Sequence, residues 1–147
     1  MKALLTAFCA LICGLACAQQ YQTNTVRFQA VDVYVDSFNI PLAAYQLEFK
    51  VTSSNAKIVG IEGGEHAAFS SAPFFDLKAI QNERAILAAF STNSVTNLPV
   101  GKTRVATIHL QISGTGEIKF ETKADAAAGS DGKKISATIS AQEKRAP

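Results

Sequence analysis

Residues 45–52 read Tyr45-Gln46-Leu47-Glu48-Phe49-Lys50-Val51-Thr52, with an apolar side chain at every odd position and a polar one at every even position. Successive side chains of a β-strand point to opposite faces, so this stretch has one face for a core and one for water. The same period of two recurs over residues 106–112 and, in shorter form, over 118–120 and 135–139. The pattern predicts a β-protein whose strands are buried on one side.

Clusters of glycine, proline and asparagine separate the alternating segments, as is typical of turns. We considered a helix over residues 76–90, on which Leu77, Ile80 and Leu87 could share a face, but the adjacent alternation favours two strands. The spacing favours one all-β domain, a jelly-roll-like antiparallel β-sandwich of about eight or nine strands. The predicted strands lie near 26–36, 43–52, 56–62, 75–80, 84–91, 103–113, 116–123 and 134–140.

Two of these strands depart from simple alternation. The apolar positions of residues 26–35 change phase between Ala30 and Val31, which predicts a β-bulge or a strand that changes sheets there. Residues 85–90, Ala-Ile-Leu-Ala-Ala-Phe, are apolar on both faces. This composition predicts a central strand partly covered by a loop or by a partner.

The N-terminus has the pattern of a signal peptide. Lys2 precedes an uncharged apolar run, and Ala16 and Ala18 provide the small residues that signal peptidase requires, with cleavage before Gln19. The run over residues 3–18 is shorter than the roughly 20 residues that span a membrane. A lipoprotein modified at Cys17 is the alternative, although Gly14 stands where such signals have a large aliphatic residue.

Cleavage at this site would remove Cys9, Cys13 and Cys17, so we expect a secreted or periplasmic domain without disulfides. The mature chain would carry 13 basic and 12 acidic residues, which gives no electrostatic reason to expect nucleic-acid binding, and we expect no stable membrane insertion. The predicted organisation is a signal peptide over 1–18, a polar segment over 19–25, a sandwich domain over 26–140 and a polar tail over 141–147.

In order, the chain contains the segments VDVYVDS (31–37), AAYQLEFKV (43–51), AKIVGIEGG (56–64), FFDLKAI (74–80), NERAILAAFST (82–92) and LPVGKTRVATIHLQISG (98–114). This order of segments resembles the cohesin-like domains of secreted bacterial proteins, and the resemblance covers nearly the whole mature chain. The resemblance implies a jelly-roll-like sandwich related to some carbohydrate-binding modules, without catalytic residues. Members close to true cohesins bind a calcium-loaded dockerin through one sheet face.

Few residues offer catalytic chemistry. Only His66 and His109 could act as a base for a serine nucleophile. His109 falls on the polar side of its predicted strand, and His66, although near Ser70 and Ser71, lacks a nucleophile elbow. Carboxylate pairs for glycoside hydrolysis could be drawn by chance in any β-sandwich. We therefore expect no enzyme, and the carboxylates considered were Glu48, Glu62, Glu65 and Asp76.

Metal binding has equally weak support. Two distant histidines cannot supply the three or four ligands of a zinc site. Oxygen donors for calcium gather at Asp32 and Asp36 and again at Asp125, Ser130 and Asp131, but neither group matches an EF-hand loop. We expect solvated turn carboxylates, no metal and no cofactor.

The segment 65–75 is the one turn-rich stretch with several large apolar residues, Phe69, Phe74 and Phe75. Such a segment more often folds over the end of a sandwich than forms a patch, but exposed phenylalanines would favour a protein partner. Sugar platforms usually use tryptophan or tyrosine, and the chain has no tryptophan and three tyrosines, Tyr21, Tyr34 and Tyr45. We expect a secreted binding module for a protein, with recognition of an extracellular polysaccharide as the alternative.

The exported protein should begin at Gln19 and contain no sulfur atom, because Met1 and the three cysteines leave together. Intact-mass spectrometry of the soluble exported form measures this directly. A membrane-bound form with diacylglycerol on Cys17 would contradict it.

Overall fold

The computed structural model describes residues 25–144, which form eight strands, one short helix and two 3-10 turns. The signal peptide, its cleavage site at Ala16, Ala18 and Gln19, Tyr21 and residues 145–147 lie outside the described residues. In order the elements are β1 (Val26–Asp36), β2 (Ala44–Val51), β3 (Ala56–Gly63), η1 (Ala67–Phe69), β4 (Phe74–Phe75), α1 (Leu77–Ile80), β5 (Arg84–Phe90), η2 (Val95–Asn97), β6 (Lys102–Ser113), β7 (Phe120–Ala128) and β8 (Thr138–Glu143).

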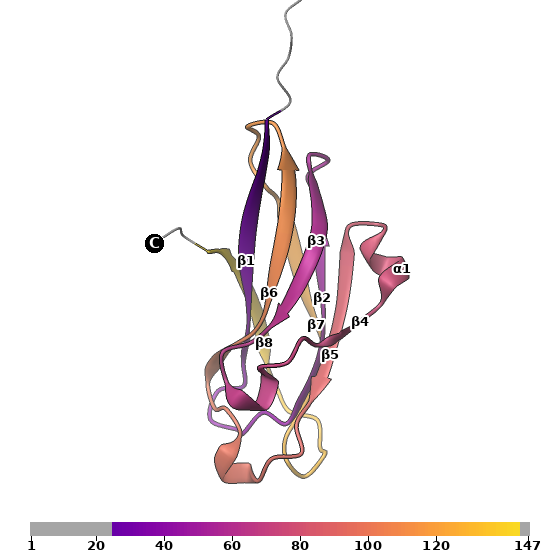
Figure 1. The fold of residues 1–147 in the computed structure, drawn as a ribbon. Coiled ribbons are helices and arrows are strands. Elements are labelled where there is room, and N and C mark those ends of the chain that lie inside the picture. Colours follow the sequence, from indigo (N-terminus) through magenta and orange to yellow (C-terminus); the bar gives the residue numbers. More distant parts are fainter. Residues whose placement is uncertain (1–24, 145–147) are drawn as a thin grey trace, which may run out of the picture.

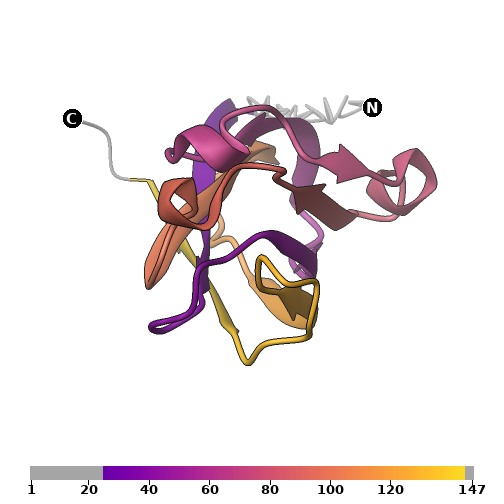
Figure 2. The ribbon, with the colours of Figure 1, turned by 90° about the horizontal axis from the view of Figure 1, so that it is seen from below.

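The strands form two four-stranded antiparallel sheets packed face to face, so the predicted all-β sandwich is confirmed (Figures 1 and 2). One sheet has the order β3-β6-β1-β8 and the other β4-β5-β2-β7. Among the strands of residues 25–144, only β4 and β5 are neighbours both in the chain and in a sheet, because the chain otherwise crosses from one sheet to the other. Long-range pairing therefore holds almost every strand in place.

The core lies between the sheets and is built from the alternating positions that the sequence predicts. Leu47 and Phe49 of β2 are fully buried, and Phe49 stacks on Phe120 with ring centroids 5.2 Å apart. From the other sheet, Val31 and Val33 of β1 face them with the inner side chains of β6. Burying one such side chain contributes about 1.5–3 kcal/mol. Other core members are Val35, Tyr45, Val51, Ile58, Leu87, Val105, Ile108, Leu110 and Ile112.

The change of phase in β1 has a different origin from the one predicted. The pairing of β1 with β6 is regular through Ala30 and Val31, so no bulge and no change of sheet occur there. Val26 and Phe28 instead lie on the outer face of the sheet, where the Phe28 side chain is 71% exposed. The register shift falls between Val33 and Tyr34, opposite an extra residue of β6.

The segment predicted as a strand over 75–80 is mostly not one. Only Phe74 and Phe75 pair with β5, and the chain then forms the single helical turn α1. The carboxylate of Asp76 accepts a hydrogen bond from the backbone N–H of Lys78 (2.8 Å), which is the contact expected of an N-cap. The alternative helix over 76–90 is also wrong, since β5 occupies its second half.

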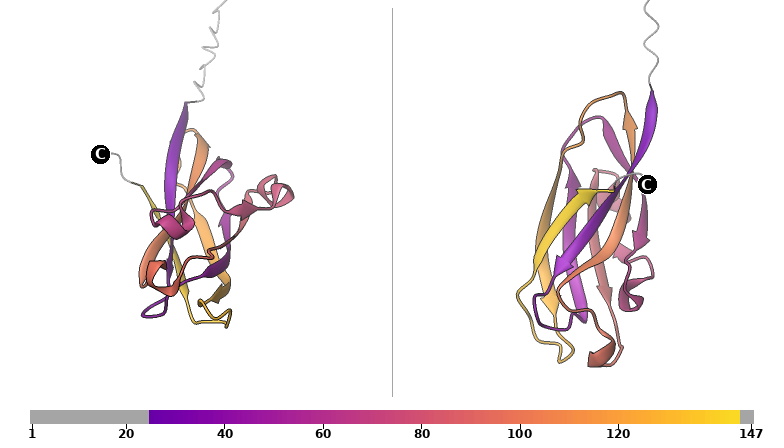
Figure 3. Two further views of the ribbon diagram at one scale, coloured as in Figure 1. Left: turned by 60° about the horizontal axis from the view of Figure 1, so that its bottom comes forward. Right: turned by 90° about the vertical axis from the view of Figure 1, so that its left-hand side faces the viewer.

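Two other strands are displaced towards the C-terminus from their predicted positions. The strand expected over 116–123 is β7, Phe120–Ala128, and the one expected over 134–140 is β8, Thr138–Glu143. The first three residues of the predicted polar tail, 141–143, thus belong to β8, which pairs with β1. Polar residues suit β8 because it is an edge strand (Figure 3).

Two adjacent glycines allow the loop after β3 to lie close to the sheet. A Cβ atom on Gly63 would overlap the carbonyl oxygen of Ser70, and one on Gly64 would overlap that of Arg104. These close approaches hold the loop that carries η1 and β4 against the sandwich.

The register of β2 can be tested by three substitutions. Leu47→Ala and Phe49→Ala should each lower the free energy of unfolding by roughly 2–5 kcal/mol, because each leaves a cavity in the core. Glu48→Ala should change it by at most about 0.5 kcal/mol, since Glu48 lies on the outer face. Urea denaturation measures all three, and a larger cost for Glu48→Ala would contradict the assigned faces.

Candidate functional site

The outer face of sheet β4-β5-β2-β7 has an apolar half near the end that carries the β5–β6 loop. In the register of this sheet, Ala44 of β2 lies between Phe90 of β5 and Ala128 of β7. In the next outward row, Gln46 lies between Ala88 and Ala126. We call Ala44, Ala88, Ala126 and Ala128 the alanine floor.

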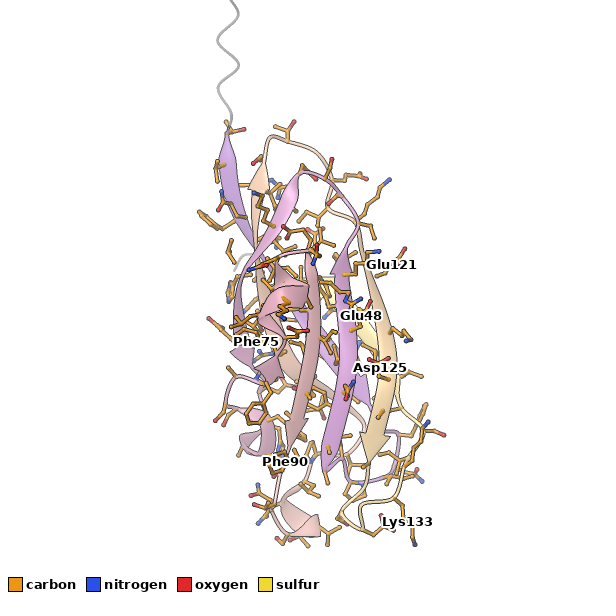
Figure 4. All side chains as sticks on the ribbon, turned by 90° about the vertical axis from the view of Figure 1, so that its right-hand side faces the viewer. Glu48, Phe75, Phe90, Glu121, Asp125 and Lys133 are labelled. Carbon is orange, nitrogen blue, oxygen red and sulfur yellow. The ribbon has the colours of Figure 1, made fainter. Side chains whose placement is uncertain are left out.

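Two exposed aromatic side chains stand beside this floor. Phe74 of β4, which pairs with Ala88, is 72% exposed. Phe90 of β5, which is labelled in Figure 4, is 65% exposed. We call these two residues the aromatic ridge. Together with Gln46 of β2 and with Gly132 and Lys134 of the β7–β8 loop, ridge and floor line an open groove of about 430 Å³. A groove of small residues beside exposed aromatics is suited to an apolar surface.

The other half of the same face is charged. Glu48 lies 3.6 Å from Arg84 (Nε to Oε2), and Lys123 lies 3.0 Å from Asp125 (Nζ to Oδ1). The hydrogen bond and charge of Asp125 raise the pKa of Lys123. Figure 4 shows Glu48, Glu121 and Asp125 towards the end of the sheet opposite to Phe90.

The boundary between the halves coincides with a register shift. The pairing of β2 with β7 is interrupted between Gln46 and Leu47, where Asp125 is the extra residue of β7. A bulge of this kind redirects side chains locally. It separates Ala126 and Ala128 from the charged pair of Lys123 and Asp125.

The outer face of the other sheet has a different character, because many of its polar groups bond to one another. Thr107 donates from Oγ1 to Asp32 Oδ1 and accepts from Arg104 Nη1, each at 2.7 Å, and both Asp32 and Thr107 are buried. The hydroxyl of Tyr34 accepts from Gln142 (3.1 Å). Such a network is largely satisfied within the molecule.

The three phenylalanines proposed from the sequence separate into two groups. Phe69 is only 3% exposed and packs edge to face on Tyr45, with ring centroids 5.3 Å apart. It therefore belongs to the core, where burial also raises the pKa of Tyr45. Phe74 and Phe75 remain at the surface, but Phe75 is 40% exposed and pairs with the inward-facing Leu87.

The two histidines have structural neighbours. Nδ1 of His66 accepts a hydrogen bond from the backbone N–H of Ala68 (3.1 Å), which caps η1. Nε2 of His109 lies 3.0 Å from Oε1 of Glu62, across the outer face of sheet β3-β6-β1-β8. Neither contact pairs a histidine with a serine hydroxyl.

The oxygen donors considered for calcium are engaged elsewhere. The carboxylate of Asp36 accepts from the backbone N–H of Phe38 (2.8 Å), and that of Asp131 from the N–H of Lys133 (3.0 Å), which lowers the pKa of Asp131. Ser130 lies in the same turn and is exposed. Within residues 25–144, no group of three or more His, Cys, Asp or Glu side chains could hold a metal ion.

The carboxylates considered for hydrolysis are dispersed over different parts of the molecule. Glu48 contacts Arg84, Glu62 contacts His109, and Glu65 accepts from the backbone N–H of Arg104 (3.1 Å) on the other sheet. Asp76 caps α1. They do not converge on one site.

Sequence reasoning missed most of the groove. The two-sided apolar segment 85–90 indicated a partly covered strand, and it does supply Phe90 and Ala88. The run 124–128, Ala-Asp-Ala-Ala-Ala, was the available signal for the rest of the floor, but alanine alone has little predictive value.

Comparison with known proteins agrees with this architecture. No family model and no curated protein matches the sequence. The structure matches a type I cohesin in a cohesin–dockerin complex from Clostridium thermocellum, with a TM-score of 0.58 and 14% identity over 75% of this chain and 82% of that chain. The fold is cohesin-like. The resemblance noted in the sequence is thereby confirmed. Separately, residues 25–144 contain no helix that is long and apolar enough to cross a membrane.

The different positions of the phenylalanines in this cohesin-like domain predict opposite effects of truncation. Phe69→Ala should lower the midpoint of thermal unfolding by about 10 °C or more, because a core cavity costs roughly 3–5 kcal/mol. Phe74→Ala should leave it almost unchanged. Differential scanning calorimetry makes the comparison, and equal effects would show that the burial of Phe69 is misassigned.

Proposed function

We propose that this chain is an exported, non-catalytic protein-binding module whose partner docks on the outer face of sheet β4-β5-β2-β7. The observation that carries the proposal is the groove formed by the aromatic ridge and the alanine floor. Exposed phenylalanines can bury much area on association. Alanines allow the backbone of a partner to approach closely.

The charged half of the face supports recognition rather than catalysis. Lys50, Arg84 and Lys123 alternate with Glu48, Glu121 and Asp125, so a partner must match a mixed pattern of charge. Charge patterns of this kind determine the orientation and rate of association more than its strength.

The cohesin-like fold also supports a protein partner. The similar solved chain is described in a complex with a dockerin. A dockerin is therefore the first probe to use, with calcium present because family members bind it in that form.

Polysaccharide recognition has less support from the described residues. Tyr45 is buried, and one face of the Tyr34 ring lies against Lys102, whose Nζ is 4.7 Å from the ring centroid. The exposed rings of the groove are phenylalanines, which lack the polar edge that sugar platforms commonly use.

Isothermal titration with a calcium-loaded type I dockerin should give saturable binding. Ala88→Arg, which fills the floor, should weaken the affinity at least tenfold, or about 1.4 kcal/mol. Ser140→Arg, an exposed position on β8 of the other sheet, is the matched control and should bind like the parent.

Two results would count against the proposal. Absence of dockerin binding would reject this partner class. Saturable affinity for a polysaccharide on a glycan array, lost on substitution of Tyr34 or Tyr21, would make the chain a carbohydrate-binding module instead.

A further inference from the structure

The two sheets formed by residues 25–144 have four edges, and three of them are protected against further pairing. At the β3 edge, Val59 is an extra residue opposite β6, and the carboxylate of Glu83 accepts the backbone N–H of Ile58 (2.8 Å). Strand β4 has only two residues. At the β7 edge, the N–H of Ile135 donates to the carbonyl of Ala127 (2.9 Å), and the bulge described above interrupts the strand. Bulges, short strands and covering loops are the usual protections of a sheet edge.

The fourth edge, β8, lacks these protections. Its six residues pair with β1 without a register shift. Just beyond the strand, the N–H of Lys144 donates to the carbonyl of Ala30, the residue directly opposite in this register (2.8 Å). The pairing of β8 with β1 is therefore regular from end to end.

This regular pairing determines which backbone groups face the open side of β8. Hydrogen-bonded pairs alternate along an antiparallel ladder, so every second residue before Lys144 also bonds to β1. The residues between them direct both the N–H and the C=O group away from β1. They are Ile139, Ala141 and Glu143.

A hollow of about 270 Å³ lies beside this open edge, between β7 and the start of β8. It is lined by Ala124 of β7 and by Ile135 and Ile139 of the segment that leads into β8. Both isoleucines are only half-buried and pack against the margin of the core. Lys134 and Ser136 add polar groups to the lining. The core is therefore only partly covered on the side where β8 has no neighbouring strand.

We propose that β8 pairs with an extended segment of a partner protein, which becomes a fifth strand of sheet β3-β6-β1-β8 and places an apolar side chain in the hollow. In this mode of recognition the backbone hydrogen bonds provide affinity, and pockets for alternate side chains provide specificity. The site lies on a different sheet from the groove. The inference therefore goes beyond the proposed function and does not depend on it.

The geometry of the edge defines the chemistry of this segment. Free N–H and C=O groups on alternate residues match the backbone of another extended strand, whereas the backbone groups of a helix bond within the helix. In the antiparallel arrangement, the residue opposite Ile139 or Ala141 directs its side chain to the inner face of the sheet. That residue should be apolar, and its two neighbours should be polar because they face water.

Amide hydrogen exchange of the exported chain, followed by NMR, measures both the open edge and its occupation. In the chain alone, the outward N–H groups of β8 should exchange faster than those that bond to β1. The probe is a short acetylated peptide of alternating valine and threonine, with a lysine at each end for solubility. At saturating peptide, exchange of the outward groups should slow by about tenfold or more, because each then donates to the peptide. These groups belong to Ile139, Ala141 and Glu143.

N-methylated forms of the peptide distinguish strand pairing from other modes of binding. In the antiparallel arrangement the valine N–H groups face β8, and the threonine N–H groups face away from it. Methylation of the valine nitrogens should abolish binding, whereas methylation of the threonine nitrogens should leave the affinity within about threefold. Replacement of valine by serine should weaken binding about tenfold, because serine gains less from the apolar lining of the hollow.

Ala141→Pro tests the edge from the side of the chain. Proline at this position removes an N–H that faces away from β1, so the pairing with β1 is kept while the ring obstructs an added strand. Binding of the peptide should be lost. Ser140→Arg is the control, because the side chain of this exposed residue lies on the outer face and not at the edge, and it should bind like the parent. If circular dichroism shows Ala141→Pro unfolded, the N-methylated peptides provide the same test on the parent chain.

Slow exchange of the outward groups in the chain alone would overturn the inference, because the edge would then already be occupied. Exchange that the peptide leaves unchanged, equal effects of the two methylations, or full binding to folded Ala141→Pro would also overturn it. Dockerin titrations without the peptide report on the proposed function separately. Failure of one experiment thus leaves the other interpretable.

Discussion

Burial of facing apolar rows between the two sheets is the interaction on which the rest of the structure depends. No cysteine occurs after Cys17, so residues 25–144 have no disulfide to constrain them. Because consecutive strands mostly belong to different sheets, most strand pairs join segments that are distant in the chain. The core therefore forms cooperatively, and the side chains of the outer faces contribute little to the free energy of unfolding.

The two outer faces differ in whether their side chains find partners within the molecule. On sheet β3-β6-β1-β8, Asp32, Thr107 and Arg104 bond to one another, so their polar groups are satisfied inside the molecule. On sheet β4-β5-β2-β7, the aromatic ridge is exposed and the alanine floor is partly exposed, so both can gain free energy by contact with another surface. This difference is the reason for proposing the second face as the binding face.

The candidate site also depends on a local irregularity. The shift opposite Gln46 and Leu47 ends the apolar half of the face and begins the charged half. A regular pairing of β2 with β7 would continue the same alternation of inner and outer side chains through both halves of the face. The bulge instead places the acidic Asp125 beside Lys123, at the limit of the groove.

The sequence by itself determined the strands whose alternation is long, such as β2 and β6, and with them the sandwich and much of its core. It also marked β5 as unusual, because a strand that is apolar on both faces needs cover on both. Tertiary structure alone decided that Phe69 is buried while Phe74, five residues later, is exposed, and that Val26 and Phe28 lie on the outer face of β1. The physical reason is that a period of two records which residues share a face but not which strands become neighbours. The groove joins alanines of β2, β5 and β7 through long-range register, to which no single segment of sequence corresponds.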